Sequence, residues 1–437
     1  MRNSSIWVVF ASVLLFAGKA SASTDINGLF DARSHGMGGT GVAYITSAGA
    51  IPINPALLEG VQKLTVTLDV FAIGAQPQAP YTRWHVDAEG NQYQSYDTIR
   101  SKVAGGPLPF LGAAYRLHPR LVLGLAFYPI IGQGTSAVYK PAPDEYPNLI
   151  ATNKASMLLV ETGEALSIKI LDNLSIALMW RITYMNQSVS TPLAASKSPS
   201  VAANVERTEV SNVNIDNTGI NFYGFQFGAL YKPLSNLSLG FTYRNRVDVW
   251  GKDGRTTGNI GGNKLDFKTA SGFSNPHSIR AGFAATAFDK RLTLALDFKY
   301  LFYAQAFKRL KTEVYNNGEG KPPTVNYSNQ YWKNSAVLQL GAEYKTTDWF
   351  ALRAGYTVLN SATRAEYAIA FGAPPGISHL ITGGLGSKAL DSLDVDVAGS
   401  YVVLEGRVKE KTMDNAGPGL YASHGGMISL SATYHSR

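Results

Sequence analysis

Large apolar residues and small or polar residues alternate along much of this chain with a period of two. The segment LSIALMWRITY (residues 174–184) shows this clearly, because Leu178 falls on one face and Arg181 on the other. Residues 237–244 and 292–300 repeat the pattern. A period of two predicts β-strands, since successive side chains of a strand point to opposite faces.

Charged residues lie on the polar face of several of these segments, as Asp297, Asp394 and Asp396 do. Their burial in the dry core of a β-sandwich would cost free energy. The water-filled interior of a barrel accepts them, while the apolar face meets lipid. The pattern therefore favours a membrane barrel over a soluble sandwich.

About 14 such segments follow residue 60, and an even number is typical of bacterial outer-membrane barrels. The connections between them alternate strictly between short turns and long loops. The short turns cover residues 117–120, 171–173, 232–236, 288–290, 345–348 and 389–392, and the long loops cover 75–106, 131–155, 188–219, 250–276, 306–334, 360–377 and 405–425. We therefore predict an all-β fold, an antiparallel transmembrane β-barrel of about 14 strands over residues 61–437.

The first residues predict export. Arg2 precedes an apolar run over residues 6–17, and Ala20-Ser21-Ala22 forms a small-residue cleavage site, so residues 1–22 are typical of a secretory signal peptide. Charged residues make up 16% of the chain, against roughly 25% in soluble domains, and cysteine is absent. An exported chain of this composition is expected in the bacterial outer membrane.

Residues 23–60 remain between the signal and the first strand. They are too few for a domain, and we predict that they fold back inside the barrel as a hatch, or plug. Asn54 can cap a helical turn that begins at Pro55 and ends at Gly60. The glycine-rich stretch GMGGTG within this region fits close packing against the wall better than a nucleotide site, because no strand precedes it.

The chain resembles the outer-membrane long-chain fatty acid transporters of the FadL type, including relatives that take up aromatic hydrocarbons. The likeness lies in the plug, with Asn54, Pro55 and Ala56 as the family's Asn-Pro-Ala, and in FGALYKPLSNLSLGFTYRNRV and YWKNSAVLQLGAEYKTTDWFALRAGYTVLNSA. The resemblance implies 14 strands, a hatch that closes the lumen, an outer low-affinity groove and an inner pocket. It also implies a kinked third strand that opens a lateral gap toward the outer leaflet.

The residues of that third strand agree with a kink. Alternation fails in LVLGLAFYPIIGQGTSAVY at Pro129, Gly132 and Gly134. Proline donates no ladder hydrogen bond, and glycine in a strand often marks a bulge. We predict a lateral opening here; the alternative is that Pro129 only ends the strand.

Four residues are candidates for substrate binding. Arg181 faces the lumen by the alternation of its strand, and Lys333 resembles a family position that holds the substrate carboxylate. A guanidinium or ammonium group at the end of an apolar pocket would bind a fatty anion. Leu29 and Phe30 could line the floor of that pocket. For both cations the alternative is a solvated lumen residue, and for the plug residues it is simple packing.

The predicted function is passive uptake of hydrophobic molecules such as long-chain fatty acids, with hatch rearrangement and lateral release. The alternatives are uptake of aromatic hydrocarbons, or a plugged barrel that serves protein interaction or secretion. The chain carries neither H-E-x-x-H nor G-x-S-x-G, so we predict no enzyme and no catalytic residue. We expect no metal, cofactor or nucleic acid, a monomer, and contact with membrane lipid and lipopolysaccharide.

Overall fold

The structure is a computed structural model. It describes residues 30–141, 149–192, 208–209, 212–260, 263–316, 320–369, 374–412 and 417–436. The predicted signal peptide and Leu29 lie outside these ranges.

The protein is a closed antiparallel barrel of fourteen strands, as the sequence predicts. Six barrel strands on one side are β1 (Leu64–Val86), β3 (Ala104–His118), β4 (Leu121–Tyr139), β5 (Leu149–Leu171), β6 (Leu174–Pro192) and β8 (Asn212–Leu234). Four are each interrupted once: β9 (Leu237–Arg244) with β10 (Val247–Ile260), β11 (Asn263–Asn275) with β12 (Ser278–Ala287), β13 (Leu292–Leu301) with β14 (Arg309–Tyr315), and β15 (Thr324–Asn329) with β16 (Ser335–Lys345). The last four are β17 (Phe350–Asn360), β18 (Ile377–Leu390), β19 (Leu393–Val408) and β20 (Gly419–Ser436).

The first and last strands close the wall, from the pair Leu64–Ser436 to the pair Gln78–Ala422. Side chains alternate across it as predicted: on β6, Leu178 is 58% exposed to the outside while Arg181 is fully buried inside. The outward apolar face suits lipid.

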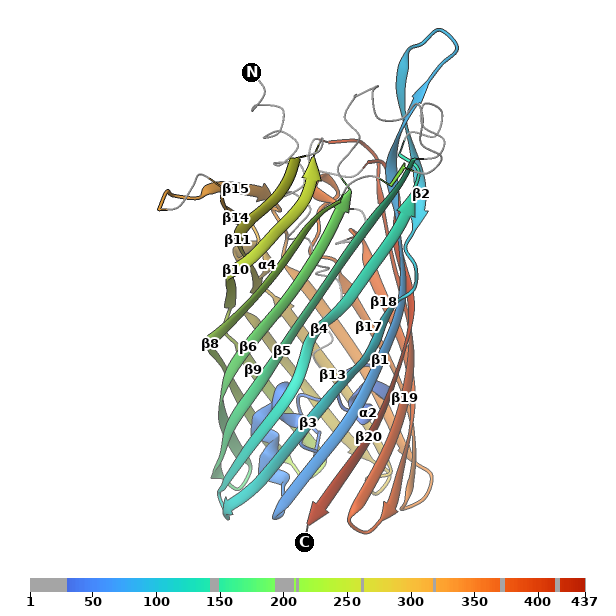
Figure 1. Cartoon of the computed structure of the whole chain (residues 1–437). Helices are drawn as coiled ribbons and strands as arrows, with labels where there is room; N and C mark the ends of the chain where they lie inside the picture. Colours follow the sequence, from blue (N-terminus) through green and yellow to red (C-terminus); the bar gives the residue numbers. More distant parts are fainter. Residues whose placement is uncertain are drawn as a thin grey trace.

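The two ends of the barrel differ. Tight turns and the C-terminus lie at one end, and the longer connections lie at the other (Figure 1). There β2 (Gln92–Arg100) extends the hairpin of β1 beyond the barrel, and β7 (Thr208–Glu209) pairs with the start of β5. The hairpin of β14 and β15 projects sideways from the wall (Figure 1). We take the turn end as periplasmic and the loop end as external.

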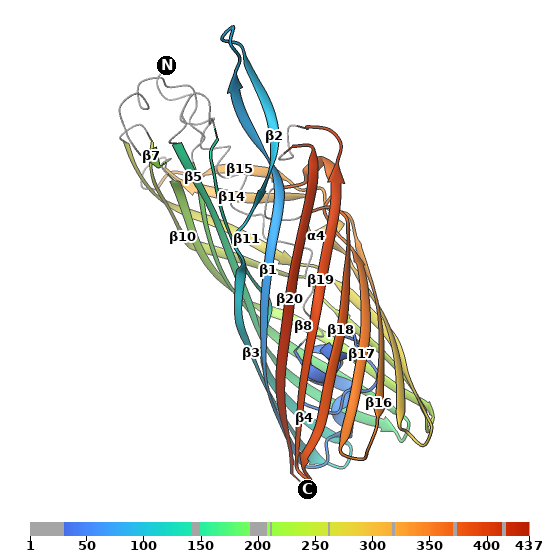
Figure 2. The same ribbon diagram turned by 90° about the vertical axis from the view of Figure 1, so that its right-hand side faces the viewer.

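Residues 30–60, called the N-terminal segment below, lie inside the lower half of the barrel (Figures 1 and 2). The segment contains α2 (Ala32–Gly36), α3 (Ala50–Ile53) and the 3₁₀-helix η1 (Pro55–Gly60). The predicted helical turn therefore exists in the tighter 3₁₀ form and ends at Gly60. Two short helices, α4 (Tyr303–Ala306) and η2 (Ala365–Tyr367), lie in connections. Among the described residues, no helix has the length and apolar character needed to cross a membrane.

Candidate functional site

The ladder between β3 and β4 stops partway along the two strands. It begins at the periplasmic turn and its last pair is Leu111–Phe127. Above this pair β3 remains paired with β1, and β4 with β5. The two edges meet again where the amide of Lys102 donates to the carbonyl oxygen of Ser136 at 2.7 Å. In the part of the chain that the structure describes, no β3–β4 pair lies between these two points.

This stretch, residues 103–110 and 128–135, is called the wall window below. Side chains rather than backbone hydrogen bonds fill it. The Leu108 side chain lies over Gly132, where an added Cβ would come within 2.6 Å of a Leu108 methyl carbon. Gly132 thus provides the space in which Leu108 covers the window.

Phe30 of the N-terminal segment lies behind the window. Its ring stacks on that of Phe110 at 6.4 Å between centroids, and lies 5.8 Å from the ring of Tyr128. All three side chains are buried. The contact therefore joins the N-terminal segment to both edges of the window.

The kink residues predicted from the sequence lie along β4 beside the window. Pro129 pairs with β5, and the β4–β5 register shifts between Pro129 and Ile131, which makes Ile130 the extra residue of a bulge. Gly134 keeps its register with Ser156. The bulge is thus at Ile130, next to the predicted proline, and not at either glycine.

A buried carboxylate holds Tyr128 from inside the wall. The Tyr128 hydroxyl donates to Oε2 of Glu161 at 2.8 Å, and Nη1 of Arg181 donates to Oε1 at 2.6 Å. Arg244 and Thr183 also donate to this carboxylate. All five side chains are buried. Because a buried carboxylate needs such partners, Glu161 ties β4 to β6 and β9.

Arg181 faces the lumen as its alternation predicts, but protein groups surround its guanidinium. Nε donates to the carbonyl oxygen of Phe225 at 3.2 Å, and Nη2 to that of Asn245 at 2.8 Å. These carbonyls lie just above the last β8–β9 ladder pair. Arg181 therefore braces an interruption of the wall. Its part in substrate binding stays a prediction.

Lys333 lies elsewhere, in the connection between β15 and β16, and its side chain is exposed. Its backbone amide donates to the carbonyl oxygen of Ala362 at 2.8 Å. The preceding Trp332 is buried and stacks on Phe307 at 4.1 Å. The structure therefore places Lys333 at the external rim, beside an aromatic cluster, and not beside Arg181.

Asn54 fixes the N-terminal segment to the wall. Its side chain accepts from the amide of Ala56, which caps η1, and Pro55 takes the first position of that helix. Its Nδ2 donates to the carbonyl oxygens of Val42 at 2.7 Å and of Ala229 on β8 at 3.0 Å. The Asn-Pro-Ala triplet is thus a cap and a wall contact at once.

Glycines on both surfaces bring the segment's backbone against the strands. Gly38 has φ of 72°, a conformation that favours glycine. An added Cβ on Gly355 of β17 would lie 2.1 Å from the Gly38 nitrogen, and one on Gly341 of β16 would lie 2.4 Å from the Met37 oxygen. The GMGGTG stretch therefore packs backbone to backbone.

Asp297, predicted to lie in the polar interior, receives the next turn of the segment. The amides of Gly41 and Val42 donate to its Oδ2 at 2.9 and 3.0 Å. Nη2 of Arg280 binds the same oxygen at 2.6 Å. One carboxylate from β13 thus anchors two successive backbone amides.

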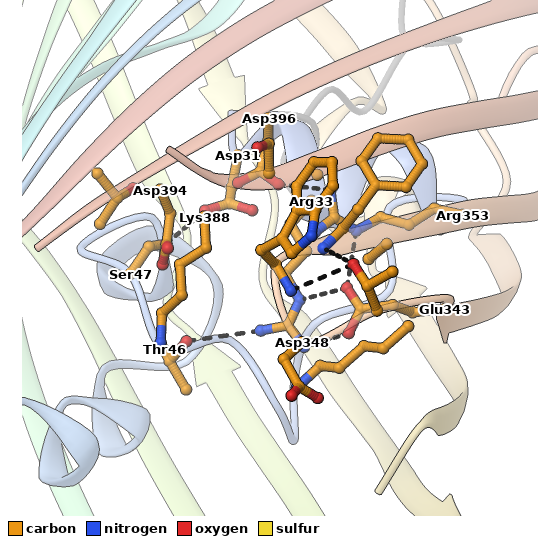
Figure 3. A pocket seen from close by; sticks show the side chains of 18 of the residues that line it. Asp31, Arg33, Thr46, Ser47, Glu343, Asp348, Arg353, Lys388, Asp394 and Asp396 are labelled. Carbon is orange, nitrogen blue, oxygen red and sulfur yellow. Dashed lines mark hydrogen bonds and ion pairs between the residues drawn. The ribbon is translucent and has the colours of Figure 1, made fainter. Parts of the chain in front are cut away.

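A chain of charges links α2 to β16, β17 and β19 (Figure 3). Nη2 of Arg33 lies 2.8 Å from Oε1 of Glu343, and Nε of Arg353 lies 2.7 Å from its Oε2. Nη1 of Arg353 in turn lies 2.6 Å from Oδ1 of Asp396. Removal of Glu343 would leave Arg33 without its carboxylate partner and Arg353 with Asp396 alone.

These charges line a cavity of about 220 Å³ between the N-terminal segment and β16–β20 (Figure 3). Asp31 lies on the segment side, Asp348 and Trp349 come from the periplasmic turn between β16 and β17, and Lys388 comes from the periplasmic end of β18. In the described ranges, no group of three or more His, Cys, Asp or Glu residues is placed to hold a metal ion. Such a charged lining disfavours apolar molecules, which gain nothing from it and displace its water.

His35 lies between two serines of the opposite wall. Its Nδ1 is 2.7 Å from Oγ of Ser429, its Nε2 is 2.7 Å from Oγ of Ser400, and its ring meets Phe71 edge-on. Burial lowers the pKa of His35 from 6.5 to about 4. The segment therefore docks with this imidazole neutral.

Our sequence reading missed three residues of this site: Phe110, Tyr128 and Glu161. A signal for Glu161 exists in the sequence. It shares a strand face with Met157 and Leu159 before it and Gly163 and Ala165 after it, so it is a lone acid within an apolar stretch of that face. For Phe110 and Tyr128, no comparable local feature of the sequence indicates which residues they contact.

Comparison with known proteins gives one consistent result. Residues 13–435 match the family model described as outer membrane protein transport protein (OMPP1/FadL/TodX). A solved FadL homologue of Pseudomonas aeruginosa aligns over 96% of this chain and 100% of its own, with 18% identity and a TM-score of 0.71. The toluene transporter TodX of P. putida aligns over 94% and 100%, with 19% identity and a TM-score of 0.71. The toluene transporter TbuX of Ralstonia pickettii aligns over 93% and 98%, with 16% identity and a TM-score of 0.65. No curated protein matches the sequence.

Proposed function

Because the chain belongs to the OMPP1/FadL/TodX family of outer-membrane transport proteins, we propose that it takes up long-chain fatty acids or similar hydrophobic molecules by passive diffusion. The family consists of outer-membrane channels for hydrophobic small molecules, not of enzymes. Aromatic hydrocarbons are the alternative substrate class of the same fold, since two of the similar structures are toluene transporters.

The wall window is the observation that carries the proposal. Backbone groups without partners are costly in lipid, and they are tolerated where they border a cavity or lie against protein. The window is framed by the outward apolar side chains of Leu111 and Phe127, which are 48% and 42% exposed. A gap in the ladder between such residues supports lateral release, from the lumen into the outer leaflet.

The charged cavity at the periplasmic end also supports lateral release. A hydrophobic molecule that continued straight through the barrel would pass Arg33, Glu343 and Arg353. A sideways exit through the wall window avoids these groups and the water around them.

The N-terminal segment acts as the hatch in this proposal. Phe30 blocks the lumen side of the window, so displacement of the segment would withdraw the ring from Phe110 and Tyr128. Glu161 holds Tyr128 in place from the other side through a hydrogen bond of 2.8 Å. Hatch movement and window opening then become one event.

A disulfide across the window tests lateral release. The chain has no cysteine, so the pair Leu108→Cys and Gly132→Cys introduces a single bridge. We expect the oxidised variant to lose uptake of a labelled long-chain fatty acid in cells, and a reductant to restore it. Toluene uptake by the same variant tests the alternative substrate class.

The matched control bridges a closed part of the same ladder, with Ala113→Cys and Leu125→Cys, which are register partners. Its oxidation should leave uptake unchanged. Uptake that persists in the oxidised window variant would show that substrate leaves by another route. Wild-type protein that takes up neither substrate would instead favour the protein-interaction alternative.

A further inference from the structure

The external part of the wall carries a second distinct surface on β10, β11 and β14. Its outward cations are Lys252, Arg255, Lys264, Lys268, Arg309 and Lys311, and its outward carboxylates are Asp248, Asp253, Asp266 and Glu313. We call these ten residues the basic patch. With six cations and four carboxylates, the patch has a net charge of +2.

Cross-strand rows place two of these lysines on aromatic rings. Trp250 pairs with Gly272, and Lys311 lies on the far side of that glycine, with its Nζ 5.7 Å from the centroid of the Trp250 ring. Two rows further up on the same face, Lys268 pairs with Tyr315, and its Nζ lies 5.8 Å from the centroid of that ring. Gly272 has no side chain, which leaves Lys311 free to reach Trp250.

These two lysine–aromatic pairs indicate the level of the basic patch relative to the membrane. Tryptophan and tyrosine on the outside of membrane proteins concentrate at the level of the lipid headgroups. Trp250 and Tyr315 mark that level on this side of the barrel, and the cations beside them lie at the same height. Lipid phosphates are therefore within reach of the patch.

The carboxylates of the patch are already paired. Arg255 binds Asp266 at 2.6 Å, Lys268 binds Asp253 at 2.7 Å, and Lys311 binds Glu313. Asp248 is bound at 2.6 Å by Arg246, which lies just before β10. Exposed pairs of this kind hold their cations only weakly. Lys252, Lys264 and Arg309 add positive charge beyond these pairs.

The β14–β15 hairpin extends the patch away from the barrel axis. It projects sideways from the wall near the external end (Figure 1). Tyr327 and Val325 on β15 continue the cross-strand rows of Lys311 and Glu313. Because it stands out from the wall, the hairpin overhangs the lipid beside the barrel.

We propose that the basic patch binds a phosphorylated glycolipid of the outer leaflet, lipopolysaccharide, through the phosphates of its lipid A. Arg and Lys bind phosphate by charge-assisted hydrogen bonds, and basic clusters beside a membrane recognise anionic headgroups. Apolar and aromatic residues of β10, β14 and β15 meet the acyl chains next to them. This contact is separate from the wall window, which β3 and β4 form.

Native mass spectrometry of the detergent-purified full chain tests the proposal, with bisphosphorylated lipid A as the probe and dephosphorylated lipid A as its partner. We expect the wild type to retain bisphosphorylated lipid A, less so as salt increases. The variant Lys264→Gln/Lys268→Gln/Lys311→Gln should lose this binding. Its barrel should still fold, since all three side chains are on the outside, and heat-modifiability on gels checks this.

The matched control removes three exposed cations near the periplasmic end, Lys63→Gln/Arg120→Gln/Arg291→Gln, and should bind as the wild type does. Equal binding by the triple patch variant, or equal binding of the dephosphorylated lipid, would overturn the proposal. So would a second copy of the chain retained in place of lipid. Uptake by the patch variant in lipopolysaccharide-free liposomes should be normal, which separates this inference from the transport proposal.

Discussion

The N-terminal segment meets the two sides of the barrel by different chemistry. On the side of β13 and β16–β20 its contacts are polar and directional: Arg33 binds Glu343, and His35 lies between two serines. On the side of β3–β5 the contacts beside the wall window are apolar, and the polar ones lie toward the periplasmic end, where Arg116 of β3 donates to the carbonyl oxygen of Glu59 and Ser167 of β5 to that of Ala56. Phe30 stacks on Phe110, and Leu58 packs against Gly124, where an added Cβ would lie 2.7 Å from its methyl carbon.

This difference in contact chemistry indicates where the N-terminal segment can move. A buried ion pair or a bonded imidazole loses most of its energy with a small displacement, because its partners are then left unsatisfied. An apolar contact weakens gradually, and another apolar molecule can replace it. The polar side is therefore the hinge and anchor, and the apolar side, which lies against the wall window, is the side that yields.

Deletion of residues 25–50 should have the largest effect on this comparison, because it removes both kinds of contact. We expect a folded, heat-modifiable barrel with raised ion conductance in planar bilayers. The strands pair with each other without the segment, so the wall itself should survive. Conductance equal to the wild type would show that the segment does not close the lumen.

Glu343→Gln should break the polar side alone. It leaves Arg33 and Arg353 without their shared carboxylate, which costs about 3–5 kcal/mol for a buried pair. We expect the segment to become sensitive to protease in detergent while the wall stays resistant. Lys169→Gln is the control, since it removes only an exposed pair with Asp172. Equal protease resistance in both variants would contradict the anchor assignment.

Acid should loosen the polar side through His35. The undocked imidazole has an ordinary pKa of 6.5 and the docked one about 4, so undocking takes up a proton between these values. Docking is fully stable above pH 6.5 and loses about 3 kcal/mol as the pH falls toward 4. Limited proteolysis at pH 4.5 and 7.5 measures this. In the variant His35→Gln, the increase in protease sensitivity that protonation of His35 causes should be absent. If the variant and the wild type show the same dependence on pH, other groups are responsible for it.

Phe30→Leu should have the smallest effect on stability. It tests the apolar side of the segment, where Phe30 lies behind the wall window. Phe30→Leu is a large-to-small exchange that removes only part of the buried side chain, so it costs about 1–2 kcal/mol, and the fold and the docking of the segment should persist. The smaller side chain leaves Phe110 and Tyr128 without their stacked partner. We expect faster uptake of a labelled fatty acid with an unchanged melting temperature. Slower uptake would mean that Phe30 guides the substrate and does not block it.

Local pattern was enough to predict the barrel. Alternation placed Leu178 outside and Arg181 inside, and the order of short and long connections predicted the two ends. Asn54, Pro55 and Gly60 predicted a capped helical turn. Each of these features depends on neighbours within a few residues, so the sequence carries it directly.

The candidate site depends on distant partners, and there the sequence was a weaker guide. Phe30 meets Phe110 and Tyr128, and Glu161 meets Arg244, only after the wall has closed. Local breaks in alternation at Pro129 and Gly134 indicated an irregular strand but not which residue bulges. Ile130 is bulged because β5 fixes the register on one edge of β4, while the other edge has no partner at that height.

The pairing of β1 with β20 also sets the order of assembly. The strand that completes the cylinder, β20, is the last of the fourteen along the chain, so no enclosed lumen exists until all fourteen are present. The N-terminal segment precedes all the strands and ends up enclosed by them. Contacts between distant parts of a chain form slowly. The polar anchors of the segment lie on β16, β19 and β20, so they can form only when these last strands are in place.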